Sequence, residues 1–76
     1  MLIKSQDGDV LIQAGAVLIR YEKERNIYYL YVCNNEGEFD VGIFDTEPKA
    51  QAILKDIQKH LENFEADSVY QVPYKI

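Results

Sequence analysis

Asp56 and His60 lie four residues apart in a segment with helical spacing, which would set a carboxylate beside an imidazole. A carboxylate that orients an imidazole is one element of a general base, the group that takes a proton during catalysis. No serine or cysteine can be assigned as a nucleophile beside this pair. We therefore expect a solvated helix surface here, and the sequence predicts no catalytic residue and no enzyme.

Cys33 and an acidic turn offer two other kinds of chemistry. A thiolate becomes reactive where a cation or a helix N-terminus stabilises it, whereas Cys33 ends the most apolar segment of the chain and is expected to pack. Asp7 and Asp9 flank Gly8 as acidic residues do in calcium loops, but the apolar residues that follow supply no further oxygen ligands. The sequence therefore predicts no metal and no cofactor.

The tyrosines form the most informative cluster. Four of them occur within eleven residues, and they are Tyr21, Tyr28, Tyr29 and Tyr31. Tyrosine is common in sheet packing and enriched at protein interfaces, and it also stacks on nucleobases. All three uses stay open. The candidate interface or ligand residues are Tyr21, Tyr28, Leu30, Val32, Arg20 and Arg25.

Thirteen acidic and eight basic residues give the 76-residue chain a formal net charge of −5. Because neutralising phosphates requires a surplus of lysine and arginine, we do not expect binding to nucleic acid or to an anionic membrane. No apolar run approaches the ~20 residues that cross a bilayer, and the first residues lack the pattern of a secretory signal. A single cysteine cannot form an internal disulfide, so a cytoplasmic location is expected.

Turn signals and apolar spacing indicate the elements that must position these residues. Strands are predicted over residues 1–5, 10–13, 16–21, 27–33, 39–44 and 69–72. The polar or glycine-containing stretches between them are typical of turns. The strand over residues 27–33 is β-branched or aromatic almost throughout and apolar on both faces, which suggests a central strand covered on two sides.

One helix is predicted over residues 46–65. Thr46 can accept a hydrogen bond from a free N–H of the first turn as the N-cap, and Pro48 lies in that turn, where its missing N–H costs nothing. Apolar residues then follow at spacings of three and four and form one stripe. The stripe comprises Ala50, Ile53, Leu54, Ile57, Leu61 and Phe64.

The predicted fold is a single small α+β domain over residues 1–76, in which an antiparallel sheet carries one helix on one face. About five strands form the sheet as a meander, and a short C-terminal strand follows the helix. A lone helix cannot cover both faces of such a sheet. The open face carries either Tyr28, Leu30 and Val32 or the alternate set from Ile27 to Cys33, and the sequence leaves that choice open.

Three stretches resemble small proteins of Firmicutes and of their phages and prophages. They are the opening MLIKSQDG, the junction VGIFDTE at residues 41–47 and the closing VYQVP at residues 69–73. The resemblance spans most of the chain in order, and its motifs are structural rather than chemical. It implies a bacterial or phage cytosolic protein with a β-rich α/β fold, and it carries over no functional residue.

These observations favour a non-catalytic cytosolic interaction module that self-associates through a sheet face or edge. A homodimer is the first expectation, and another protein is the second choice of partner. The alternative is a binder of a small nucleotide-like ligand, such as a phage-type sequestering or anti-defence protein, with a base on the tyrosines and a phosphate on Arg20 or Arg25. A weaker alternative, an acidic protein inhibitor, rests on net charge alone.

Overall fold

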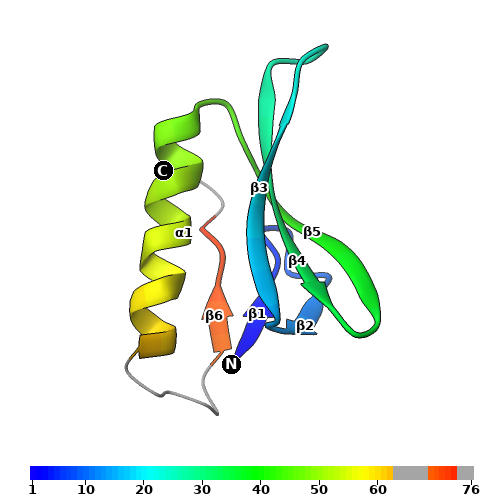
Figure 1. The fold of residues 1–76 in the computed structure, drawn as a ribbon, viewed down its shortest axis with the longest axis vertical. Coiled ribbons are helices and arrows are strands. Elements are labelled where there is room, and N and C mark those ends of the chain that lie inside the picture. The colour runs from blue at the N-terminus through cyan, green and yellow to red at the C-terminus, as the bar shows by residue number, and fades with distance from the viewer. Residues whose placement is uncertain (63–68, 74–76) are drawn as a thin grey trace.

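A computed structural model of the chain describes residues 1–62 and 69–73. Its elements in chain order are β1 (Leu2–Lys4), β2 (Leu11–Gln13), β3 (Ala16–Glu22), β4 (Ile27–Asn34), β5 (Gly37–Phe44), α1 (Glu47–Glu62) and β6 (Val69–Gln71) (Figure 1). The predicted α+β class is confirmed, with an antiparallel meander, one helix packed against it and a short C-terminal strand.

The described strands form two three-stranded sheets (Figure 1). The larger sheet has the order β3-β4-β5 and is antiparallel throughout. In the smaller sheet β1 pairs antiparallel with β2 and parallel with β6, so the C-terminal strand lies beside the N-terminal one. The chain passes from one sheet to the other at Gly15, where a Cβ atom would lie 2.3 Å from the carbonyl oxygen of Cys33.

Helix α1 packs on the inner face of the larger sheet and closes the core. Its buried residues are Ala50, Ile53 and Ile57. From the larger sheet, Leu30, Val32, Val41 and Phe44 join this core. The smaller sheet adds Ile3, Ile12 and Tyr70, and Val72 follows β6. The inner face is therefore covered by the helix and the smaller sheet together.

The helix begins where the sequence predicts. The hydroxyl of Thr46 accepts a hydrogen bond from the Lys49 N–H at 3.4 Å, and the Thr46 carbonyl accepts from the Ala50 N–H. Asp45 forms an ion pair with Lys49 at 3.0 Å beside this first turn. Ile53 and Ile57 of the predicted stripe are buried, whereas Leu61 is 43% exposed. The predicted end of the helix, with Phe64, lies outside the described residues.

A β-bulge interrupts β5. Leu30 of β4 lies opposite Gly42, but the next residue, Tyr31, lies opposite Asp40, so Val41 is skipped. Val41 is buried, and its carbonyl accepts a hydrogen bond from the Gln6 N–H at 2.8 Å. The bulge therefore turns Val41 into the core and joins β5 to the loop after β1.

Candidate functional site

The structure places the predicted contact residues on both faces of the larger sheet. Leu30 and Val32 are 0% exposed and belong to the core beneath α1. Tyr28 is half-buried on the same face, and its ring lies 4.9 Å from that of the exposed Tyr21. Leu30 and Val32 therefore cannot contact a partner while this core is closed, and the open face carries the alternate set.

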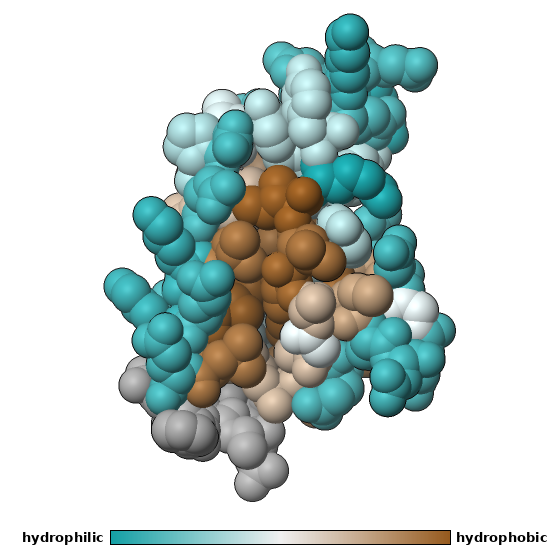
Figure 2. All heavy atoms as spheres, in the orientation of Figure 1, coloured by the Kyte–Doolittle hydropathy of each residue, from teal (hydrophilic) through white to brown (hydrophobic). Residues whose placement is uncertain are grey.

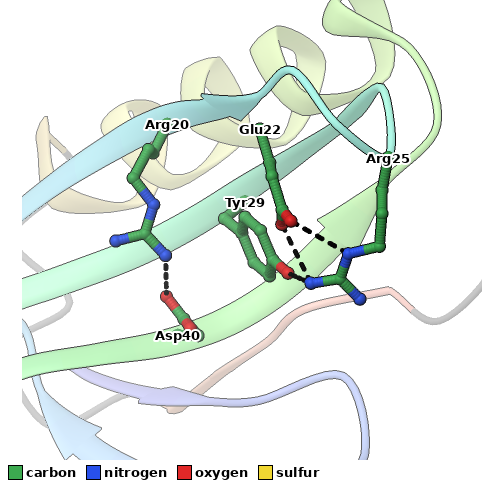
Figure 3. Close-up of polar contacts among 5 residues, drawn as sticks. All are labelled: Arg20, Glu22, Arg25, Tyr29 and Asp40. Atoms are coloured by element: carbon green, nitrogen blue, oxygen red, sulfur yellow. Dashed lines mark hydrogen bonds and ion pairs between the residues drawn. The ribbon is translucent and has the colours of Figure 1, made fainter.

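Arg20 lies on the edge strand β3, and its side chain reaches across the open outer face toward β5 (Figure 3). Its guanidinium carbon lies 5.0 Å from the ring centre of Tyr29 and 5.5 Å from that of Tyr31, so the cation stacks on both rings. It also pairs with Asp40 of β5 at 3.6 Å, and both side chains of this pair are 51% exposed. The sheet register explains the cluster, because Arg20 lies opposite Tyr29 and Tyr31 lies opposite Asp40.

Arg25 is also paired within the molecule (Figure 3). Its guanidinium donates two hydrogen bonds to the Glu22 carboxylate, at 3.0 and 2.9 Å, and one to the Tyr29 hydroxyl. These bonds hold the pKa of Glu22 below its ordinary value. The neighbouring Glu22 carboxylate, which favours the protonated phenol, raises the pKa of Tyr29. Arg20 and Arg25 are brought to the same face, but each already has a carboxylate partner.

A hollow of about 310 Å³ lies beside this cluster, between β5 and the loop after β1. It is lined by Ser5, Gln6, Asp7, Tyr29, Asp40, Val41, Gly42 and Ile43. Two of these side chains are carboxylates, and no arginine or lysine is among the described lining residues. The hollow therefore offers a ring for stacking but a negative environment to a phosphate group.

Apolar side chains gather at the surface where β3 passes beside α1. Figure 2 shows this area in brown at the centre of the view, bordered by polar groups. The apolar residues of the two elements that keep exposed surface include Val17, Leu18, Ile19, Leu54 and Leu61. We call these five residues the β3 edge surface. The predicted helical stripe included Leu54 and Leu61, whereas the sequence assigned no face to Val17, Leu18 and Ile19, because exposure at a sheet edge depends on which strands pair.

Asp56 and His60 do not form the carboxylate–imidazole pair that their spacing suggested. The His60 Nδ1 atom lies 2.9 Å from the main-chain oxygen of Asp56, whereas the Asp56 carboxylate accepts a hydrogen bond from the Tyr70 hydroxyl at 2.7 Å. The His60 ring meets the Tyr70 ring edge-on, with 5.0 Å between the centres. Burial raises the pKa of Tyr70, and the hydrogen bond to Asp56 raises it further. This cluster ties α1 to β6.

Across residues 1–62 and 69–73, no group of three or more His, Cys, Asp or Glu side chains is placed to hold a metal ion. In the same part of the chain, no helix has the length and apolar character needed to span a membrane. Cys33 is a free, half-buried thiol opposite Glu38 on the outer face. No family model matches this sequence, and no curated protein or solved structure shows significant similarity to it.

Proposed function

We propose that this protein is a non-catalytic interaction module that associates with a second copy of itself. The observation that carries the proposal is the β3 edge surface, an apolar area that the described residues leave open to water (Figure 2). Leu18 of β3, on the outer face, is 41% exposed, and Leu61 of α1, on the side of the helix, is 43% exposed. Large apolar areas on small proteins commonly mark a contact surface.

Size gives a physical reason for association. A chain of this length buries only ~60% of its unfolded surface on folding, so its stability margin is small. Covering further apolar surface contributes roughly 25 cal/mol per Å² removed from water. A dimer that covers the β3 edge surface therefore gains stability that one copy lacks.

Sedimentation equilibrium at low micromolar concentration tests the proposal. We expect the mass of two chains, with a fraction of dimer that rises with protein concentration. The mass of one chain at all concentrations tested would contradict it. The cytoplasmic location, expected from the single cysteine and from the resemblance, and the phage or prophage origin, implied by the resemblance, belong to this proposal.

The ligand-binding alternative has less support. The hollow beside Tyr29 offers a stacking surface, but Asp7 and Asp40 line it, and both nearby arginines are paired with carboxylates. A nucleotide phosphate would have to displace one of these pairs. A thermal-shift screen with cyclic and linear nucleotides is expected to show no rise in Tm, and a concentration-dependent rise would favour ligand binding.

A further inference from the structure

The edges of the two sheets differ in how well they are protected. Among the described strands, β2 and β6 end the smaller sheet and β3 and β5 end the larger one. An edge strand exposes unpaired N–H and C=O groups, to which another strand can add. Proteins block such edges with short strands, charges or bulges. Both edges of the smaller sheet are three residues long, which leaves little to pair.

The β5 edge is protected in three ways. Glu38 and Asp40 place negative charge along it, and the bulge at Val41 breaks its regular geometry. The side chain of Gln6 then occupies the place of a neighbouring strand. Its Oε1 accepts from the Ile43 N–H at 2.7 Å, and its Nε2 donates to the Ile43 carbonyl at 3.2 Å.

The β3 edge has no bulge and no side chain in the place of a neighbouring strand, and its two charged residues, Arg20 and Glu22, lie in its second half. It is seven residues long, and its register with β4 runs without interruption from Ala16 to Glu22. Its first four residues are Ala16, Val17, Leu18 and Ile19, with no charge and no proline. In the described part of the chain, no strand pairs with the far side of β3. The longest regular edge is thus also the apolar one.

We propose that β3 pairs antiparallel with β3 of a second copy across a twofold axis. This inference rests on the proposed function and specifies its surface. The two larger sheets become one six-stranded sheet, and because the axis is perpendicular to that sheet, both α1 helices lie on the same side. The pairing satisfies the open edge and covers the β3 edge surface of both copies, as a self-complementary contact requires.

Charge selects the register of this pairing. Opposite residues of an antiparallel pair share a face, so Arg20 must meet an outer-face residue of the copy. An axis at Arg20 would oppose two like charges, and an axis at Ile19 would set the two arginines diagonally, about 7–8 Å apart. An axis at Leu18 instead places Leu18 against its own copy and Arg20 against Ala16. An axis at Val17 or Tyr21 would pair only three residues of β3, although the latter would oppose Arg20 to Glu22. We therefore assign the axis to Leu18.

A second copy also meets no net charge at this edge. The charged side chains of β3 are Arg20 and Glu22, and each is paired within its own chain, with Asp40 and with Arg25. Two molecules of formal charge −5 repel one another over most approaches. The uncharged run from Ala16 to Ile19 is where this repulsion is weakest on the larger sheet.

The test compares Leu18→Lys with Ile43→Lys by sedimentation equilibrium. Both positions are exposed on the outer face, 41% and 50%, but only Leu18 lies on the proposed axis. We expect Leu18→Lys to raise the dimer Kd about tenfold or more, because two lysines then oppose one another, while Ile43→Lys leaves it within about twofold. Circular dichroism verifies that both variants are folded.

Cysteine crosslinking tests the register without adding charge. In a Cys33→Ala background, Leu18→Cys should form a disulfide-linked dimer on mild oxidation, because opposite Cα atoms of about 4.5–5.5 Å fit a disulfide. Ile43→Cys in the same background should remain largely unlinked. Equal linking of both variants would overturn the assigned register and pairing.

The outcomes separate this inference from the proposed function. A wild-type dimer that only Ile43→Lys weakens overturns the β3 pairing but keeps self-association, now through the outer face. A wild-type dimer that neither variant weakens also overturns the pairing. A monomeric wild type overturns both proposals and would leave the open β3 edge to a strand of another protein.

Discussion

Arg20 and Arg25 are exposed cations whose charges are already paired within the molecule. Each pairs with one carboxylate and also contacts the ring or the hydroxyl of Tyr29. Ion pairs this exposed are weak, and salt screens them. Their consequence for function is larger than their contribution to stability, because they leave no unpaired guanidinium on the outer face for an anion.

Gly15 is the residue at which substitution should cost most for its size. A Cβ atom there would lie 2.3 Å from the Cys33 carbonyl oxygen, which is backbone and cannot rotate away. We expect Gly15→Ala to lower the free energy of unfolding by about 1–3 kcal/mol, measured by urea denaturation. Gly42→Ala is the control, since its closest neighbours, from 3.0 Å, are side-chain atoms of Phe44 and Val72. A larger loss for Gly42→Ala would contradict this ranking.

Tyr70 makes a pH-dependent contribution to stability. Its pKa is raised by burial and by Asp56, so above the ordinary value of 10.0 the unfolded chain loses this proton before the folded one does. The contribution is full below that pH and decreases as the pH rises through the raised pKa. We expect Tyr70→Phe to cost about 1 kcal/mol near neutral pH.

Above pH 10.0 the stability difference between wild type and Tyr70→Phe should shrink, because the variant has no phenol to ionise. Urea denaturation at a series of pH values measures this difference. Tyr31→Phe is a control, since Tyr31 lies on the outer face away from Asp56. A difference that grows with pH would contradict the assignment.

At the scale of elements, Gln6 joins the two sheets at the β5 edge. Its side chain makes three hydrogen bonds, two with Ile43 and one with the Pro73 carbonyl at 3.0 Å. Gln6→Ala should lower the free energy of unfolding by about 1–3 kcal/mol, because three backbone groups lose a partner. Gln13→Ala, which removes one bond to the Met1 carbonyl, is the matched control and should cost less.

Opening the β5 edge should also change the solution behaviour of the chain. Once Gln6 is removed, Ile43 presents free backbone groups beside an exposed apolar side chain. Light scattering at high protein concentration should then detect larger aggregates of Gln6→Ala than of Gln13→Ala. Equal scattering from the two variants would show that Gln6 has no protective role.

Helix α1 and the two sheets show which features of the fold can be predicted from neighbouring residues and which cannot. Thr46 and Pro48 marked the helix start through contacts with immediate neighbours, and the structure places that start where these residues indicate. The division into two sheets was not predicted. It depends on the approach of Gly15 to Cys33 and on the parallel pairing of β1 with β6, which join residues far apart in the chain.

At the scale of the whole molecule, net charge opposes self-association. Each copy carries a formal charge of −5, while the β3 edge surface itself is apolar. Added salt screens the repulsion and leaves the apolar contact intact. We therefore expect the dimer Kd to fall as NaCl rises from about 0.05 to 0.5 M, measured by sedimentation equilibrium. A Kd that rises with salt would indicate a contact made by opposite charges.

The sequence by itself determined the class of the fold, because strand alternation, turn residues and the helical stripe act over a few neighbouring residues. It identified a crowded tyrosine cluster and predicted that a lone helix leaves one face of the sheet open. Only the tertiary structure decided which face of β4 is open. Leu30 and Tyr29 both belong to apolar faces, and Leu30 is buried in the core because its face packs against α1. The tertiary structure also decided that β3 is the less protected edge, because protection of β5 comes from Gln6, which lies 37 residues from Ile43.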